Sequence, residues 1–289
     1  MKGRIALITG ATSGIGRVTA RELARMGAKV VVVGRDPVKL DALKREIGAD
    51  TIRADLQLTS ETRRAAAEFA NRYARLDVLV NNAGALFGRR QLSAEGLERT
   101  FALNHMAYFT LTTGLLDLLR ASAPARVISV SSEASRGGRI DFGDLQMERR
   151  YLSIRQYCNT KLMNLLFAFE LSRRLQGSGV TSNALHPGAI ASGFAMRDAG
   201  WFGALTRLAR PFMIGEEKGA RTQIWAASEP SLEKVTGKYF VRQRERPPPR
   251  AALDQEAARR LWEQSERIAA GAPTSPAPIG GRSNEIVRR

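Results

Sequence analysis

Tyr157 and Lys161 are two side chains whose types and spacing would permit proton transfer. They are four positions apart in a stretch of helical character, so a helix would place both on one face. A free tyrosine has a pKa of about 10, high for proton exchange near neutrality, but a nearby ammonium group favours the phenolate. The pair could therefore act as an acid/base, whereas the commoner alternative for this spacing is a solvated helix face.

A glycine-rich segment near the N-terminus could hold a phosphate. The apolar run Ile5–Thr9 leads directly into Gly10, Gly14 and Gly16, and a helical pattern follows. A glycine turn between a strand and a helix lets backbone amides approach a pyrophosphate. The segment lacks the Lys-Ser/Thr ending of a P-loop, which disfavours ATP or GTP chemistry. The alternative is a tight turn that uses glycine only for its backbone freedom.

Arg35 and Asp36 follow the next β-branched run, where dinucleotide-binding folds contact the ribose. An acidic residue at this place suits NAD, whereas an arginine accommodates the 2′-phosphate of NADP. Arg35 therefore favours NADP(H), with Arg17 as a second cation. NAD(H) is the alternative through Asp36, which could instead cap the following helix. Both arginines could also be ordinary surface residues in so basic a chain.

The elements that must position these residues alternate along the chain. Continuous apolar runs at 5–9, 30–33, 77–80 and 126–130 suit buried parallel strands, and helical patterns separate them. Because parallel strands require crossover connections, we expect an α/β fold. Its centre would be a doubly wound, Rossmann-type parallel sheet with helices on both faces, in a single domain.

Two longer stretches and the C-terminal region add to this framework. Helices are expected at about 97–120 and 154–175, and their apolar residues could form the chain's own core or pair with a second subunit. Residues 242–270 are expected to form a basic, proline-rich linker and a helix at about 253–269. Residues 271–289 are Gly-, Ala-, Pro- and Ser-rich, so we expect a disordered tail.

Composition excludes several classes of protein. The 289 residues carry a formal charge of +17, with one cysteine and two histidines, so we expect no disulfide and no metal site. No apolar run approaches the ~18–20 residues of a membrane span, and the first residues leave no room for a signal peptide. A cytoplasmic protein is therefore expected. The arginines are dispersed and no recognition motif accompanies them, so we expect no nucleic-acid partner.

Taken together, these residues resemble the motifs of the classical short-chain dehydrogenase/reductase family, in the expected order over residues 4 to about 241. The matching groups are Thr9–Gly16 (cofactor loop), Asp55-Leu56 (adenine contact), Asn81–Gly84, the catalytic tetrad Asn104, Ser132, Tyr157 and Lys161, and Pro187-Gly188 with Ser192, where the family more often has threonine. A narrower resemblance, to the retinol dehydrogenase-like branch, rests on Tyr157-Cys158, Leu185–Gly188, Gly237–Phe240 and Arg260–Trp262.

The resemblance implies an NADP(H)-dependent oxidoreductase that interconverts an apolar ketone or aldehyde with its alcohol by hydride transfer. Tyr157 would be the acid/base, Ser132 would stabilise the substrate oxygen, Lys161 would contact the nicotinamide ribose and Asn104 would hold a relay water. Ser131 would be a structural neighbour. The implied cofactor-binding residues are Gly10, Thr12, Ser13, Gly14, Ile15, Gly16, Arg17, Arg35, Asp55, Leu56, Asn82, Ala83, Gly84, Tyr157, Lys161, Pro187, Gly188, Ile190 and Ser192.

The domain of residues 1–241 is expected to include a substrate lid at about 192–214. Its large apolar residues favour an apolar ligand, although they could pack on the core instead. Interspersed arginines could touch an acidic group on the substrate or make weak peripheral contact with an anionic membrane, but no transmembrane segment is expected. The family implies a homodimer or homotetramer. The alternative function is a catalytically silent NADP(H)-binding sensor or scaffold, against which the intact Ser132, Tyr157 and Lys161 argue.

Overall fold

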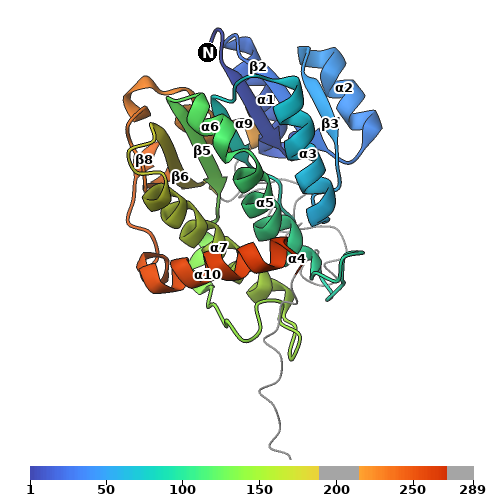
Figure 1. Cartoon of the computed structure of the whole chain (residues 1–289), viewed down its shortest axis with the longest axis vertical. Coiled ribbons are helices and arrows are strands. Elements are labelled where there is room, and N and C mark those ends of the chain that lie inside the picture. Colours follow the sequence, from blue (N-terminus) through green and yellow to red (C-terminus); the bar gives the residue numbers. More distant parts are fainter. Residues whose placement is uncertain (189–214, 272–289) are drawn as a thin grey trace, which may run out of the picture.

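The computed structural model describes residues 1–188 and 215–271. Within them, an eight-stranded sheet has the order β3-β2-β1-β4-β5-β6-β7-β8. Neighbouring strands are parallel except β7 and β8, which are antiparallel. Helices cover both faces of the sheet (Figure 1). The expected doubly wound α/β fold is therefore confirmed.

The parallel strands are apolar along most of their length because helices cover both of their faces. In the centre, Leu7 pairs with Val31 on one side and with Leu79 on the other. The strands are β1 (Ile5–Thr9), β2 (Lys29–Gly34), β3 (Asp50–Arg53), β4 (Val78–Asn81), β5 (Ala125–Val130), β6 (Val180–His186), β7 (Tyr239–Val241) and β8 (Arg244–Glu245).

Two apolar clusters, one on each face of the sheet, form the core. Successive strand residues point to opposite faces, so Ala6 and Ile8 pack with α1, α2 and α9, while Leu7 packs with α3, α5 and α7. The main helices are α1 (Gly14–Arg25), α2 (Pro37–Ile47), α3 (Thr59–Arg72), α4 (Arg99–Phe101), α5 (Ala107–Gly114), α6 (Leu116–Ala121), α7 (Ser153–Arg174), α9 (Glu216–Ser228) and α10 (Gln255–Ala269).

The single helix expected at about 97–120 is wrong in detail. A π-helical turn, Ala102–Met106, separates α4 from α5, and a break at Leu115 separates α5 from α6. The π turn contains Asn104, whose side-chain amide binds the backbone of Ala85 on a neighbouring segment. Apolar periodicity could not reveal the turn because such a bulge depends on contacts between segments distant in sequence.

The apolar faces of the two long helical stretches lie within the chain's own core. Helix α10 lies across α7 (Figure 1), where the ring of Trp262 stacks on Phe167 at a centroid distance of 5.8 Å. Trp262 also meets the edge of Phe109 in α5. The buried apolar residues on these helices include Leu111, Leu115, Leu162, Leu165, Leu166 and Phe169, with Leu118 partly buried. Of the two explanations left open by the sequence, intrachain packing is thus the one the structure supports.

The segment after residue 241 contains more structure than a linker. The antiparallel pair formed by β7 and β8 extends the sheet into Arg244–Glu245, and a short 3₁₀ helix, Arg250–Leu253, follows the prolines. Helix α10 then begins at Gln255, where Asp254 caps it by accepting a hydrogen bond from Ala257 N at 2.9 Å. The helix therefore starts two residues later than the apolar pattern suggested.

Candidate active site

The glycine loop after β1 is shaped by contacts that exclude side chains. A Cβ added to Gly16 would lie 2.5 Å from both Asn82 Nδ2 and Gly10 O, and one added to Gly10 would lie 2.8 Å from the Ala83 Cα. Gly10 and Gly14 also have positive φ angles of 67° and 60°. The loop therefore approaches the segment after β4 closely, and only glycine fits there.

Asn82, directly after the neighbouring strand β4, holds this loop in place through hydrogen bonds. Its side-chain nitrogen donates to Thr9 O at 2.8 Å and to Gly10 O at 3.3 Å. The hydroxyl of Thr9 accepts from the backbone nitrogens of Asn82 and Ala83 at 2.9 and 3.0 Å. Sequence motifs on two different strands thus hold the turn at the N-terminus of α1, the kind of place where backbone amides bind a pyrophosphate.

The charged residues expected at the ribose have different partners. Asp36 caps α2 by accepting a hydrogen bond from Lys39 N at 3.3 Å. Arg17 pairs with Glu46 at 2.6 Å. Arg35 is about half exposed and lies 3.9 Å from Asp55. The capping alternative proposed for Asp36 is therefore what the structure contains, while the role of Arg17 as a second cation stays a prediction.

A cavity of about 540 Å³ opens beside Arg35. It is lined by Arg35, Arg53, Asp55, Glu61 and Arg64. Arg53 ends β3 and pairs in register with Gly34, the residue before Arg35, so the sheet brings the two arginines together. Arg53 forms no ion pair within the described part of the chain, whereas Arg64 pairs with Glu68 at 3.1 Å. Arg53 and Arg64 escaped the sequence analysis because strand pairing brings Arg53 beside Arg35, and only the packing of α3 brings Arg64 to the same cavity.

The remaining cofactor-loop residues surround these features. Thr12 lies near Gly34, since a Cβ on that glycine would meet its methyl group at 3.2 Å. Ser13 precedes the first residue of α1, and Ile15 packs partly into the core. Asp55 accepts from the backbone and side chain of Gln57, at 3.0 and 3.1 Å. Leu56 and Ala83 are buried and Gly84 is partly buried.

Asn104 joins the cofactor side of the site to helix α7. Its Oδ1 accepts from Ala85 N at 2.8 Å, and its Nδ2 donates to Ala85 O and to the hydroxyl of Thr160, both at 3.0 Å. The side chain is fully buried. Its amide is thus occupied by protein partners, and the relay water expected from the family resemblance stays a prediction.

Two adjacent serines at the end of β5 point to different partners. The hydroxyl of Ser131 is buried and donates to Lys161 O at 2.7 Å. Ser132 caps the next turn by accepting from Ala134 N at 3.2 Å, and its side chain is near enough to the Tyr157 phenol to lower the pKa of that group. The structure therefore brings Ser132, and not Ser131, to the phenol.

Burial dominates the electrostatics of Tyr157 and Lys161. It raises the pKa of Tyr157, which the hydrogen bond with Ser132 partly opposes. It lowers the pKa of Lys161 to about 7. The Lys161 ammonium donates to Val130 O at 3.1 Å and lies 5.6 Å from the Tyr157 ring centroid. The expected lowering of the Tyr157 pKa by this ammonium is thus not what the structure contains, because desolvation has the larger effect.

The end of β6 closes the site near Ser132. Nδ1 of His186 accepts from Glu133 N at 3.3 Å and from Gly188 N at 3.4 Å. His186 is therefore a hydrogen-bonded strand residue that joins the turn after Ser132 to Pro187-Gly188. Ile190, Ser192 and the expected lid at about 192–214 lie outside the described residues, as does the tail from residue 272.

These features fit a dinucleotide. Three features follow one another along the carboxyl ends of β1, β2 and β3: the glycine loop, the N-terminus of α1 and the cavity beside Arg35. Ligands bind at this edge in open α/β sheets. Within residues 1–188 and 215–271 there is no group of three or more His, Cys, Asp or Glu side chains placed to hold a metal ion.

Fold and site together define a dinucleotide-binding oxidoreductase of the Rossmann type. The family model of the short chain dehydrogenases matches residues 4–201, and the chain belongs to that family. It falls within the retinol dehydrogenase-like branch and acts on alcohol or carbonyl groups. In the described part of the chain, no helix is long and apolar enough to cross a membrane.

Individual relatives support this assignment. Retinol dehydrogenase 12 of Mus musculus is 41% identical over 91% of this chain and 85% of its own length. Retinol dehydrogenase 13 of Homo sapiens is 40% identical over 92% and 84%. A solved structure of an uncharacterized Mycobacterium paratuberculosis protein superposes with a TM-score of 0.74 at 34% identity, covering 94% of this chain and 95% of that one. RhlG of Pseudomonas aeruginosa, solved as an NADP active-site complex, has a TM-score of 0.66 at 28% identity, covering 83% and 94%.

Proposed function

We propose that this protein uses NADP(H) to interconvert an apolar ketone or aldehyde with its alcohol. The observation that carries the proposal is that the Ser132 side chain acts on the Tyr157 phenol and lowers its pKa, with Lys161 one helical turn further along α7. Ser132 follows the end of β5, and Tyr157 and Lys161 lie on α7. All three are at the same edge of the sheet as the glycine loop, so that a substrate oxygen could meet them beside the cofactor.

The side chains have distinct roles in this reaction. Bound NADP(H) supplies or accepts the hydride. In reduction, Tyr157 donates its phenolic proton to the substrate oxygen, and burial suits this role because it keeps the phenol protonated. The Ser132 hydroxyl donates a hydrogen bond to the same oxygen as negative charge develops. Lys161, with a pKa of about 7, can exchange protons near neutrality and so restore the proton of Tyr157.

The preference for NADP(H) rests on the cations near the end of β2. Arg35, Arg53 and Arg64 line one cavity together with Asp55 and Glu61, and Asp36, the carboxylate next to Arg35, caps α2. A 2′-phosphate would gain charge-assisted hydrogen bonds from these guanidinium groups. The NADP complex of the relative RhlG is consistent with this preference.

The apolar character of the substrate is inferred from the sequence of the expected lid and from relatives named as retinol dehydrogenases. Weak contact of the lid arginines with an anionic membrane, the homo-oligomer and a cytoplasmic location stay predictions. The apolar faces of α5 and α7 give no support to the prediction of an oligomer, since α10 packs on them.

Cofactor titration followed by a substrate panel tests the proposal. NADPH and NADH binding would be followed by fluorescence, and turnover by absorbance with retinal, medium-chain aldehydes, steroid ketones and quinones. Tighter binding of NADPH and turnover that Tyr157→Phe abolishes are the expected results. Preferential NADH binding would contradict the role of the arginines. NADPH binding without any turnover across the panel would favour the sensor alternative.

A further inference from the structure

Glu98 is a completely buried acidic residue outside the proposed catalytic set. Its side chain has 0% exposure, although carboxylates are rarely buried unless paired. No described lysine or arginine forms an ion pair with it; instead, four hydrogen-bond donors surround it. Oε1 accepts from Thr100 N at 2.9 Å and Tyr151 Oη at 3.2 Å, and Oε2 accepts from Phe101 N at 2.8 Å and Gln156 Nε2 at 3.0 Å. Each carboxylate oxygen thus accepts two hydrogen bonds.

Three of these four donors lie on helical segments next to the proposed catalytic residues, and Tyr151 lies in the segment before α7. Thr100 and Phe101 lie in α4, which continues directly into the π turn containing Asn104. Gln156 lies in the first turns of α7, immediately before Tyr157. The carboxylate therefore joins the segment of Asn104 to the residue that precedes the proposed acid/base.

The same region of α7 has a second link to the π turn. Asn104 donates to the hydroxyl of Thr160, and that hydroxyl donates to Tyr157 O at 2.9 Å. The Glu98–Gln156 contact before Tyr157 and the Asn104–Thr160 contact after it therefore hold the helix backbone on both sides of the phenol. Such paired constraints fix both the position and the direction of a side chain.

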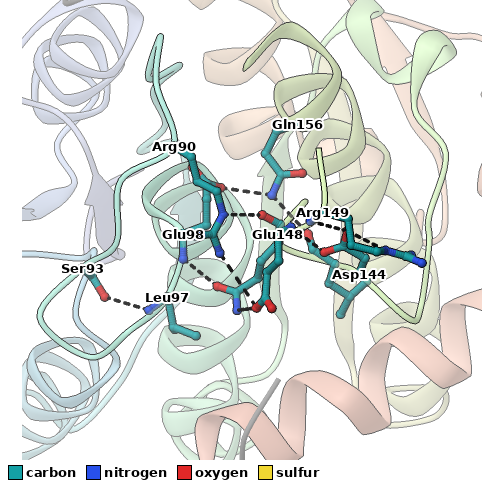
Figure 2. A network of polar contacts seen from close by, with 10 residues as sticks. Arg90, Ser93, Leu97, Glu98, Asp144, Glu148, Arg149 and Gln156 are labelled. Atoms are coloured by element: carbon teal, nitrogen blue, oxygen red, sulfur yellow. Dashed lines mark hydrogen bonds and ion pairs between the residues drawn. The ribbon is translucent and has the colours of Figure 1, made fainter. Parts of the chain in front are cut away.

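Glu98 and Gln156 also connect this junction to the surrounding loops. Gln156 Nε2 donates to Leu145 O at 3.1 Å, and Glu98 N donates to the side-chain oxygen of Gln146 at 2.6 Å. Figure 2 shows Glu98 and Gln156 within this polar network. The N-terminal capping of α4 explains the hydrogen bonds that Glu98 accepts from two backbone nitrogens. It does not explain why the same carboxylate also accepts a hydrogen bond from the side chain of Gln156, the residue next to Tyr157.

We infer that Glu98 is a positioning residue that acts through Gln156 to align Tyr157 for proton transfer. The inference rests on the proposed function, because it assigns Tyr157 the acid/base role. Proton transfer requires the donor within hydrogen-bond reach of the reacting oxygen. Removing the contact would let the first turns of α7 shift, and displacements of about 1 Å can cost on the order of a hundredfold in rate.

Two nearly isosteric variants of the full chain test the inference from opposite sides of the contact. Glu98→Gln replaces one oxygen by an NH₂ group that must face the backbone N–H of either Thr100 or Phe101. Gln156→Met removes the donor and keeps the side-chain volume. With NADPH and an active aldehyde, we expect kcat to fall about tenfold or more in each variant, with the Kd for NADPH unchanged. In the double variant, kcat should fall no further than in the poorer single variant, because both substitutions break the same Glu98–Gln156 contact.

Tyr151→Phe is the matched control. It removes another donor to the Glu98 carboxylate but leaves the link to Gln156 intact. We expect a lower unfolding temperature in all three single variants and a large loss of kcat only in Glu98→Gln and Gln156→Met. Unchanged kcat in Gln156→Met, additive losses in the double variant or an equal loss of kcat in Tyr151→Phe would overturn the positioning role.

Tyr157→Phe in the same assay separates this inference from the proposed function. Full activity of Tyr157→Phe would contradict the acid/base assignment itself. An inactive Tyr157→Phe, together with wild-type kcat in Gln156→Met, would overturn only the role of Glu98 and Gln156.

Discussion

Helices α1 and α7 serve the two halves of the site in different ways. Apart from Thr19, whose hydroxyl bonds the helix's own Ile15 O, α1 buries only Gly16, Val18, Ala20 and Leu23. Helix α7 buries a series of polar side chains, namely Gln156, Asn159, Thr160, Lys161, Asn164 and Glu170. The cofactor half is therefore built from backbone shape and close packing, whereas the catalytic half is built from side chains that hold one another. Changes in the first half should alter binding, and changes in the second should alter turnover.

The largest expected effect is on the catalytic half. Tyr157→Phe removes the phenolic proton, so kcat should fall by about a hundredfold to ten-thousandfold, the usual contribution of a general acid. The Kd for NADPH should stay within about twofold, since the glycine loop is untouched. Steady-state kinetics and fluorescence titration on the same preparation would measure both. Comparable losses of kcat and of NADPH affinity would contradict the division into a cofactor half and a catalytic half.

Gly16→Ala is the corresponding change in the cofactor half. The new methyl group would lie 2.5 Å from Asn82 Nδ2 and Gly10 O, so the loop must shift. Overpacking of this kind costs about 1–3 kcal/mol, and we expect the Kd for NADPH to rise about ten- to hundredfold. Gly143→Ala is the control, because its Cβ would meet only a flexible aspartate oxygen, at 3.3 Å. NADPH binding by Gly16→Ala that equals the wild type would show that the loop does not hold the cofactor.

A smaller effect should distinguish the two cofactors. Arg53→Ala removes one cation from the cavity beside Arg35, and we expect the Kd for NADPH to rise about tenfold, the value of a single charge-assisted hydrogen bond. The Kd for NADH should not change, because NADH has no 2′-phosphate. Arg25→Ala, at an exposed residue of α1 paired with Glu22, provides the control for net charge. An equal loss for NADH and NADPH would contradict recognition of the 2′-phosphate by Arg53.

The last prediction concerns stability and not rate or binding: a pH dependence of stability that originates in the catalytic half. Lys161 has a pKa lowered to about 7 in the folded chain, whereas an unfolded lysine has a pKa of about 10.4. Between these values the unfolded chain binds more protons, so the free energy of unfolding should rise with pH from 7 to 9. The upper limit for one group is about 1.4 kcal/mol per pH unit.

Denaturant unfolding of Lys161→Met at several pH values measures this contribution. The variant should lose the rise that the wild type shows over the same range. Lys44→Met, at an exposed position of α2, should retain it. An identical pH dependence in the wild type and Lys161→Met would mean that the buried lysine keeps its ordinary pKa.

Much of the fold could be predicted because strand–helix alternation is a local property of the chain. Apolar runs such as Ile5–Thr9 lie on buried strands as expected. The helix at 97–120 was misjudged because the π turn at Asn104 is stabilised by Ala85 and Thr160, which are distant in sequence. Oligomerisation was suggested by apolar helix faces, but hydrophobicity alone cannot say whether a face meets another chain or, as here, α10.

The sequence by itself determined the order of the motifs, the glycine turn and the spacing of Tyr157 and Lys161. These depend on local geometry, since helix periodicity places residues four apart on one face. Only the tertiary structure decided that Ser132 meets Tyr157, that Arg53 lies beside Arg35, and that Glu98 and Lys161 are buried. The physical reason is that strand register and desolvation arise from packing between distant segments, and they set both the neighbours and the pKa of each group.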